Sequence, residues 1–415
     1  MTRIPELLAP AGDWKNLQAA LDAGADAIYF GVRGFNMRAS AKNFSVRDMP
    51  RIVELCHARK VRAYLTANTL VYQAELPALE KLLQAAAAAK VDGVIASDFA
   101  VIEAARRHGI EVHASTQMSV GNSSAMLFLH ALGVRRFVLA RECSLDDIRA
   151  LRRALVKALG KAAAAEVQIE LFAHGAMCVS VSGRCFMSEQ HTGKSANRGA
   201  CTQPCRREYR IVEEKGPHEW VLGENYVMSP KDLCTLPFIE KLIAAGADSL
   251  KIEGRIRSPE YVAIVVSAYR KALDFYAAKK GRANWLADFE VLKKGLLERV
   301  SEVYNRGFSS GFYCGKPIEE WTKAAGNVAT KRRHLVGIVL NYYKKPSVVH
   351  LAVQDNGFSE GEELLFEGPT TGFFMQASGP LLLDGQPCAK VGSGAEPTLV
   401  SIKPLRRGDK VYVMR

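Results

Sequence analysis

The sequence predicts an α/β fold built on a closed barrel of eight parallel strands, followed by a small antiparallel β-barrel domain. Two observations predict the first part. Eight short apolar runs recur between residues 6 and 255, and helical patterns separate most of them. The runs are continuously apolar, as in parallel strands covered on both faces. The count of eight favours a TIM-type (β/α)8 barrel over an open doubly wound sheet, which is the alternative.

The eight runs follow one another at the spacing of βα units. Amphipathic helical patterns occupy residues 14–25, 76–89, 100–109 and 145–160, and several end at a glycine suited to a helix C-terminus. Two further helices are expected at 260–280 and 285–304. The strand-like runs are ELLAPAG from Glu6, DAIYFG from Asp26, VRAYLTAN from Val61, GVIASD from Gly93, EVHAST from Glu111, RFVLARE from Arg136, QIELFAHG from Gln168 and SLKIEGR from Ser249.

The pattern changes near residues 317–334. From Leu335 the chain shows short alternating runs with turns, such as VGIVLNYY and GDKVYVMR, which are typical of an antiparallel β-barrel. We therefore predict two domains, an α/β barrel over residues 1–330 and a β-barrel over residues 331–415.

The connection after the seventh run is abnormally long. About 70 residues separate His174 from Ser249, against roughly 2–6 in an ordinary loop of this kind. In a barrel, this insertion (about 178–235) lies at the mouth where the strands end and where active sites of such barrels are found. Other polar residues expected at this mouth are Asn68, Asp98, Ser115, Thr116, Gln117 and Glu142.

Four cysteines are crowded into this insertion with the spacing C-x6-C-x15-C-x3-C, at Cys178, Cys185, Cys201 and Cys205. Disulfides are not expected in a reducing compartment. Structural zinc usually takes two close cysteine pairs, and only the second pair has that form. An iron–sulfur cluster accepts looser spacings, so the spacing leaves a cluster, zinc and free thiols open. Cys234 is an alternative to Cys205 as the fourth ligand.

Charged side chains end several of the runs. In SLKIEGR, Lys251, Glu253 and Arg255 alternate on one side of a strand, and charges facing into a barrel must be paired or bind a ligand. One interpretation is a structural ion pair of Glu253 with a neighbouring arginine. The other is a cage in which Arg38, Arg141 and Arg255 bind a small carboxylate.

His174 ends the seventh run. A histidine can serve as acid, base or ligand at neutral pH, but one beside cysteines is more often packed or hydrogen-bonded. We treat His174, together with Glu253, as a candidate catalytic residue.

The insertion is also basic, and the whole chain carries a net charge of +13. Such a field favours polyanions. The basic residues either form a solvated surface or contact the phosphates of a nucleic acid. The candidates for nucleic-acid binding are Lys194, Arg198, Arg206, Arg207 and Arg210.

No secretion signal and no apolar run of about 18 residues is found in the sequence. We therefore expect a cytoplasmic protein with no membrane partner.

The segment ELFAHGAMCVSVSGRCFMS, from Glu170 to Ser188, resembles the signature of the collagenase-like peptidase family U32. The segments GADAIYFG, VHASTQ, LARE, SANRGACTQPCR, MSPKDL, SLKIEGR and NRGF also resemble family segments, in family order. The resemblance covers essentially the whole chain, including the C-terminal β domain.

Within the family, the segment SANRG followed by C-x3-C is most similar to members that hydroxylate RNA. Those members install 5-hydroxyuridine at the tRNA wobble position or hydroxylate a cytidine of 23S rRNA. The resemblance implies a [4Fe–4S] cluster on the four cysteines, prephenate as a co-substrate and oxygen-independent chemistry. It also implies that a second family member can act as a partner subunit. The tRNA reaction is the closer analogy, because the chain lacks the long C-terminal extension of the rRNA enzyme.

Two other classes of function compete with the hydroxylase. A peptidase is suggested by the family label, but the sequence holds neither H-E-x-x-H nor G-x-S-x-G. A cysteine nucleophile would need a nearby histidine and could not also bind a metal. A non-catalytic RNA chaperone would explain the charge but would leave the cysteines and the polar mouth unused.

Overall fold

The computed structural model describes residues 4–210, 215, 224–226, 228–318, 320–324 and 326–415. Within these residues, no helix has both the length and the apolar character needed to cross a membrane.

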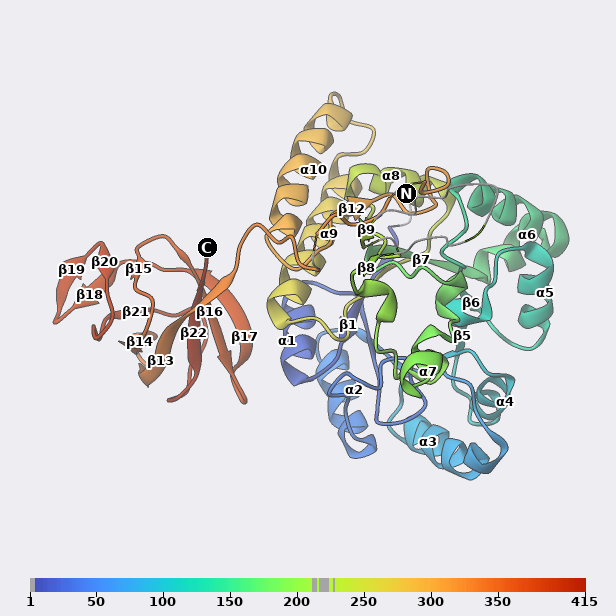
Figure 1. The fold of residues 1–415 in the computed structure, drawn as a ribbon, viewed down its shortest axis with the longest axis horizontal. Helices are drawn as coiled ribbons and strands as arrows, with labels where there is room; N and C mark the ends of the chain where they lie inside the picture. Colours follow the sequence, from blue (N-terminus) through green and yellow to red (C-terminus); the bar gives the residue numbers. More distant parts are fainter. Residues whose placement is uncertain (1–3, 211–214, 216–223, 227, 319, 325) are drawn as a thin grey trace.

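Eight parallel strands form a closed barrel (Figure 1). Each strand pairs with the next along the chain, and the last one, β11, pairs with both β1 and β7, which closes the ring. The prediction of a TIM-type barrel is therefore confirmed, and all eight apolar runs are barrel strands. These are β1 (Glu6–Ala11), β2 (Ala27–Phe30), β3 (Arg62–Ala67), β4 (Gly93–Ala96), β5 (Val112–Ala114), β6 (Arg136–Val138), β7 (Gln168–Gly175) and β11 (Ser249–Ile252).

Helices surround this ring, and several start at a polar cap that the sequence provides. The Asp13 carboxylate accepts a hydrogen bond from the Asn16 amide (3.0 Å), and Asp98, Asn122 and Ser144 cap later helices in the same way. The helices are α1 (Trp14–Asp22), α2 (Met49–His57), α3 (Leu76–Ala88), α4 (Phe99–Arg107), α5 (Ser123–Ala131), α6 (Leu145–Glu166), α8 (Ile239–Ala245), α9 (Pro259–Lys279) and α10 (Trp285–Ser301).

Helix α6 runs beyond the predicted end at Gly160. The backbone of Gly160 leaves the helical conformation (φ 79°, ψ 162°) but the chain resumes helical turns up to Glu166. Glycine adopts this positive φ at no steric cost, so it interrupts the helix here without ending the segment.

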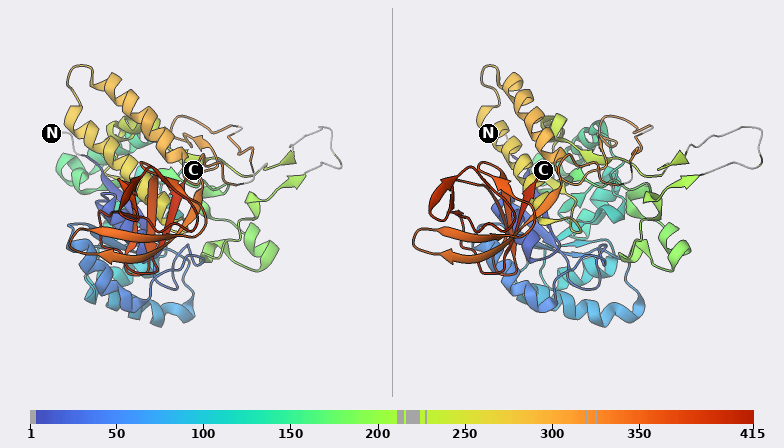
Figure 2. Two further views of the ribbon diagram at one scale, coloured as in Figure 1. Left: turned by 90° about the vertical axis from the view of Figure 1, so that its left-hand side faces the viewer. Right: turned by 60° about the vertical axis from the view of Figure 1, so that its left-hand side comes forward.

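The insertion after β7 is largely built from short turns and one short helix, α7 (Met187–Thr192). It continues through the paired strands β8 (Tyr209–Arg210) and β9 (Glu224–Asn225), which project from the body of the molecule (Figure 2). It returns in β10 (Asp232–Cys234), which pairs antiparallel with the end of β7 and parallel with β12 (Phe308–Ser309). The insertion is thereby attached to the barrel mouth.

The C-terminal region is an eight-stranded antiparallel sheet that begins with β13 (Arg333–Tyr343) and encloses its own apolar core. It contacts the barrel through α1 and through ion pairs such as Arg299–Glu363 (2.6 Å) and Arg333–Glu260 (3.6 Å). The other strands are β14 (Val348–Val353), β16 (Glu363–Gly368), β17 (Gly372–Ala377), β18 (Leu381–Leu383), β19 (Gln386–Cys388), β21 (Thr398–Val400) and β22 (Lys410–Met414), and β15 (Phe358–Ser359) pairs separately with β20 (Lys390–Val391).

The barrel interior holds a network of buried charges. The Arg136 guanidinium, 1% exposed, lies between Glu6 and Glu170, and the Lys251 ammonium lies 3.1 Å from Glu170. Tyr64 donates a further hydrogen bond to Glu6 (3.0 Å). Arg62, whose side chain is about half exposed, also pairs with Glu6, so three cations neutralise the two carboxylates at this end of the barrel.

We predict that Arg136→Met lowers the free energy of unfolding by about 3 kcal/mol. The substitution removes the cation between Glu6 and Glu170 and leaves each carboxylate with one remaining counter-charge, Arg62 for Glu6 and Lys251 for Glu170. Adding Glu6→Gln should recover part of the loss. The measurement is urea unfolding followed by circular dichroism, with Arg153→Met on the exposed face of α6 as control. Equal midpoints for Arg136→Met and Arg153→Met would contradict the prediction.

Candidate functional site

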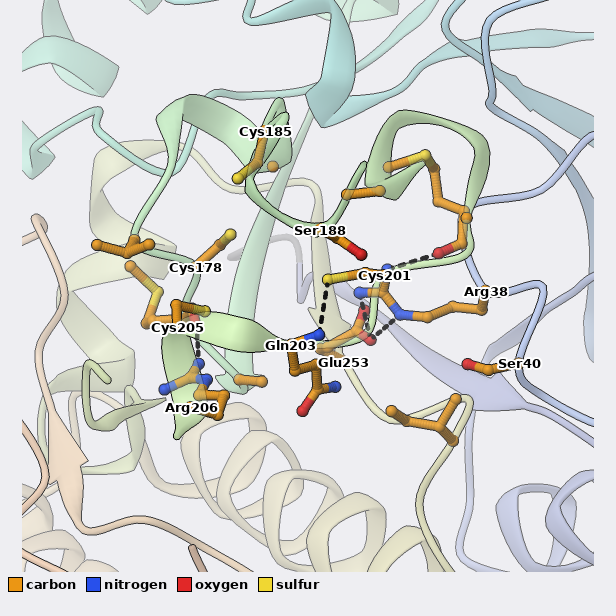
Figure 3. A pocket seen from close by; sticks show the side chains of 18 of the residues that line it. Arg38, Ser40, Cys178, Cys185, Ser188, Cys201, Gln203, Cys205, Arg206 and Glu253 are labelled. Atoms are coloured by element: carbon orange, nitrogen blue, oxygen red, sulfur yellow. Dashed lines mark hydrogen bonds and ion pairs between the residues drawn. The ribbon is translucent and has the colours of Figure 1, made fainter. Parts of the chain in front are cut away.

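The four clustered cysteines line one cavity of about 140 Å³ at the barrel mouth (Figure 3). All four are free thiols, and Cys201 is exposed while the other three are half-buried. Polar groups surround them. The Met187 amide donates to the Cys185 Sγ (3.4 Å), the Gln203 amide donates to the Cys201 Sγ (3.4 Å), and the Cys178 Sγ lies 2.9 Å from the Ser180 hydroxyl.

In the described part of the chain, no group of three or more His, Cys, Asp or Glu side chains converges closely enough to hold a single metal ion. A tetrahedral zinc site requires four ligands within about 2.3 Å of one atom. In a four-iron cluster each thiolate binds a different iron, so the thiols stand further apart around a shared space. Four thiols around one cavity therefore fit a four-iron cluster better than a single zinc ion.

Cys234 lies elsewhere. It is buried on β10 beside the Tyr269 hydroxyl and does not line the thiol cavity in the described structure. Burial raises the pKa of its thiol to about 12.

Local contacts fix the insertion over the barrel mouth. Gly199 has a positive φ of 82°, and a Cβ there would lie 2.2 Å from the carbonyl oxygen of Asn36. Its own carbonyl accepts a hydrogen bond from the Ala39 amide (3.0 Å). The neighbouring Arg198 binds the Glu75 carboxylate (2.8 Å). Only glycine permits so close an approach to the loop that carries Arg38.

Arg206 ties three segments of the site together. Its guanidinium donates to the Ser229 hydroxyl (2.9 Å), to the Pro230 carbonyl (2.7 Å) and to the Met177 carbonyl. We call this set of contacts the Arg206 clamp. It fixes Cys178, which follows Met177, and Cys205, which precedes Arg206.

A second, smaller cavity of about 40 Å³ adjoins the first and extends into the barrel. The two share Met37, Arg38, Gln117, Arg141 and Glu253 as lining residues. We refer to it as the arginine cavity. The four residues predicted to bind a small carboxylate all line it, namely Arg38, Arg141, Lys251 and Arg255.

Glu253 is a carboxylate anchored in this cavity. Its Oε1 accepts hydrogen bonds from the Arg38 Nε (3.0 Å) and Nη2 (2.8 Å), and its Oε2 lies 3.4 Å from the Tyr29 hydroxyl. Burial alone would raise the pKa of Glu253, but the charges of Arg38 and Arg141 outweigh burial and lower it to about 2. The ion pair with a neighbouring arginine, which the sequence left open, is therefore present.

Two arginines of the arginine cavity make no ion pair with any described carboxylate. Arg255 is buried and donates to the Thr66 hydroxyl (2.6 Å) and to the Asn36 side chain. Burial lowers its pKa to about 10, so it stays charged at neutral pH. Arg141 lies over the Phe172 ring (4.1 Å) and donates to the Ala176 carbonyl (3.3 Å). The cavity thus carries more positive than negative charge.

A sequence profile described as Peptidase family U32 matches residues 12–323 of the chain. The chain belongs to this family. It is similar to a protein named Collagenase from Porphyromonas gingivalis, with 37% identity over 409 residues, 98% of this chain and 97% of the relative. It is also similar to tRNA hydroxylation protein P1 of Bacillus subtilis, with 38% identity over 375 residues, 89% of this chain and 85% of the relative.

A third relative is matched over less than half of its own length. The 23S rRNA 5-hydroxycytidine synthase of Escherichia coli is 37% identical over 276 residues, which cover 66% of this chain and 40% of the relative.

In this family member, His174 sits behind the two cavities. It is 2% exposed and is surrounded by the rings of Tyr261, Tyr269 and Phe308. Burial and the charge of Arg257 lower its pKa to about 3, so the imidazole is neutral. In the described structure it lines neither cavity. The catalytic role of His174 stays a prediction, and its position suits packing against the mouth.

The five predicted RNA-binding residues divide into two groups. Lys194 and Arg207 are exposed, as is Arg210 on β8. Arg198 and Arg206 are half-buried and bind protein groups, as described above. A cluster of cations in a sequence does not reveal which of them point inward.

Sequence reasoning missed several residues of the site. Asn36 orients both Arg255 and the Arg38 amide (3.0 Å), and Arg257 and Arg306 line the thiol cavity. Arg257 lies two positions beyond Arg255, where the alternation seen in SLKIEGR continues, and this signal could have identified it.

We predict that iodoacetamide at pH 8 labels Cys201 of chelator-treated protein much faster than Cys234. The thiolate is the reactive form, and burial together with a pKa of about 12 keeps Cys234 protonated. Timed labelling followed by peptide mass spectrometry measures both rates. Cys56, also buried with a pKa of about 12, is the matched protected thiol. Equal labelling rates of Cys201 and Cys234 in the folded protein would contradict the prediction.

Proposed function

We propose that this protein is an RNA-modifying hydroxylase that hydroxylates carbon 5 of the wobble uridine of tRNA without molecular oxygen. The proposal is carried by one observation, that the thiol cavity and the arginine cavity adjoin at the barrel mouth. Four thiols line one, and two arginines without a carboxylate partner line the other. The relatives named tRNA hydroxylation protein and 23S rRNA 5-hydroxycytidine synthase support an RNA hydroxylase.

We assign Cys178, Cys185, Cys201 and Cys205 as ligands of a [4Fe–4S] cluster, which when bound would supply one-electron chemistry beside the substrate. Cys205 is preferred to Cys234 because it lines the thiol cavity. The backbone amides that donate to Cys185 and Cys201 stabilise negative charge on sulfur.

The arginine cavity would bind the co-substrate, a dicarboxylate such as prephenate. A buried excess of positive charge is stabilised when an anion enters, and Arg141 and Arg255 can each donate two hydrogen bonds to a carboxylate. The Lys251 ammonium lies 3.1 Å from the Glu170 carboxylate and would add positive charge on the barrel side of the arginine cavity. Glu253 stays ionised at neutral pH, so its role is to orient Arg38 or to accept a proton from the substrate.

The RNA would approach from the side of the insertion. Lys194, Arg207 and Arg210 are exposed there and can contact phosphates. The target base has to leave its stack to reach the cavity, and an anticodon loop presents such a base already unpaired.

A peptidase is the second candidate, because the relative from P. gingivalis is named Collagenase. A cysteine peptidase requires a histidine within hydrogen-bond reach of the thiol. In the described structure, the polar partners of Cys178, Cys185 and Cys201 are Ser180, Met187 and Gln203, and no histidine lines the thiol cavity. The site geometry therefore favours the hydroxylase.

The cluster assignment predicts that protein purified without oxygen is brown and holds about four iron and four sulfide per chain. Cys178→Ala and Cys201→Ala should lose most of the iron, since each removes one ligand. Cys205→Ala should do the same, and Cys234→Ala should retain it. Iron and sulfide analysis with absorption spectra measures these contents. One zinc per chain without sulfide would refute the assignment.

The function predicts that deleting the gene removes a hydroxylated pyrimidine, 5-hydroxyuridine or its derivatives, from tRNA. The test is mass spectrometry of total nucleosides in a strain without other family members. Wild-type protein should restore the modification, Arg255→Met should restore less than a tenth of it, and Arg153→Gln, on the outer face of α6, should restore it fully. Unchanged nucleosides in tRNA and rRNA would exclude the hydroxylase and turn attention to peptide hydrolysis.

A further inference from the structure

A third cavity, of about 590 Å³, opens next to the thiol cavity and plays no part in the assignments above. Met177, Cys178 and Val179 line both. The wall of this groove is formed by apolar side chains that reach solvent, with Trp321 40% exposed and Ile318 77% exposed. Phe312 adds a second aromatic ring. Large exposed apolar surfaces of this kind mark binding sites more often than chance solvent contact.

Backbone contacts join the residues around Trp321 to the segment at Ser229–Lys231. Trp321 forms a β-bridge with Pro230, the Lys231 amide donates to the Glu320 carbonyl (3.0 Å), and the Thr322 amide donates to the Ser229 carbonyl (2.8 Å). Arg206 binds Ser229 and Pro230 from the other side and also binds Met177. One guanidinium therefore connects the Trp321 segment with the residue preceding Cys178.

The carboxylates of the groove are bound to other groups. Glu142 accepts hydrogen bonds from the Ser182 amide (2.8 Å) and hydroxyl (2.9 Å), Asp147 caps α6 through Ser144, and Glu320 pairs with Lys231 (2.6 Å). At the rim, Lys316 is exposed and makes no ion pair with any described residue, and the same is true of Lys323 nearby in sequence. The groove thus combines an aromatic wall with one unpaired cation, Lys316, while Glu142 and Asp147 are hydrogen-bonded to neutral groups elsewhere in the lining.

We infer that this groove binds an unstacked nucleobase of the RNA, adjacent in the strand to the nucleotide that enters the thiol cavity. The inference rests on the proposed function. Bases separated from their helix stack on aromatic side chains without regard to sequence, and Trp321 offers such a ring. Lys316 at the rim can contact an adjacent phosphate. Because both cavities share Cys178, a strand that places one base in each passes directly over this cysteine.

A hydrophobic peptide is the competing occupant. An apolar wall alone would suit it equally, but the wall shared with the thiol cavity, the unpaired Lys316 at the rim and the net charge of +13 favour a polyanion. The experiment below separates the two.

The test compares wild type, Trp321→Ala and Trp321→Phe as full chains with the cluster loaded. Phe128→Ala, which removes an exposed aromatic ring (62% exposed) from α5, away from the groove, is the control. The probe is a fluorescein-labelled anticodon stem-loop RNA, with the affinity measured by anisotropy at fixed salt. We expect Trp321→Ala to weaken binding about tenfold, Trp321→Phe to bind within about threefold of wild type, and Phe128→Ala to bind as wild type. Thermal melting checks that each variant is folded.

A second readout reports the stacking itself. Addition of unlabelled stem-loop should quench tryptophan emission in wild type, and the quenching should be largely lost in Trp321→Phe. Equal RNA affinity of wild type and Trp321→Ala would overturn the inference. So would quenching of Trp321 by a gelatin peptide but not by RNA, which would assign the groove to peptides.

These results are independent of the hydroxylase test. Affinity and quenching are measured on purified protein, whereas the function is decided by nucleosides from the deletion strain. A groove that does not need Trp321 for RNA leaves the hydroxylase proposal standing, and an RNA-binding groove in a protein without effect on nucleosides refutes only the hydroxylase.

Discussion

Neutralisation of buried charge governs the architecture of the barrel. Charges removed from water are costly unless each has a partner. In the lower part of the barrel, Glu6 and Glu170 are matched by Arg136, Lys251 and the half-exposed Arg62. Higher up, Arg38 matches Glu253. Arg141 and Arg255 have no carboxylate partner among the described residues, so the excess charge is confined to the point where the strands end. Under the proposed function, this excess positive charge would attract the carboxylates of the co-substrate.

The segment that carries two of the thiols packs directly against the loop that carries Arg38. Gly199 of the insertion packs against the loop at residues 36–39, whose Asn36 holds Arg255 and whose Arg38 holds Glu253. A side chain at position 199 would push this loop away, because the nearest atom belongs to the backbone and cannot rotate aside. The segment SANRGACTQPC thus has a steric function in addition to the ligand role that we propose for its cysteines. It positions two cysteines and supports the arginine cavity at the same time.

Much of this organisation could be predicted from the sequence. Eight continuously apolar runs gave the number and order of barrel strands, because a strand buried on both faces excludes polar residues over its length. The same count placed Lys251, Arg255 and the cysteines at the mouth. The direction of individual arginines could not be predicted. Arg206 and Arg198 look like surface cations, yet their partners Pro230 and Glu75 come from segments far away in sequence. His174 is similar, since the rings around it come from α9 and β12.

A substitution of Arg206 would affect three parts of the site at once. Its guanidinium contacts Met177, Ser229 and Pro230, and these segments border the thiol cavity and the Trp321 groove. The thiol cavity in turn opens into the arginine cavity through Arg38 and Arg141. The thiol cavity, the arginine cavity and the Trp321 groove therefore meet around the contacts of Arg206. A shift of the Arg206 guanidinium would move these three cavities relative to one another. Substitutions of residues that share such a network are not additive. A change at Arg206 would alter the spacing between groove, thiols and arginines together, whereas a change at Trp321 or Arg255 alters one compartment and leaves the others in place.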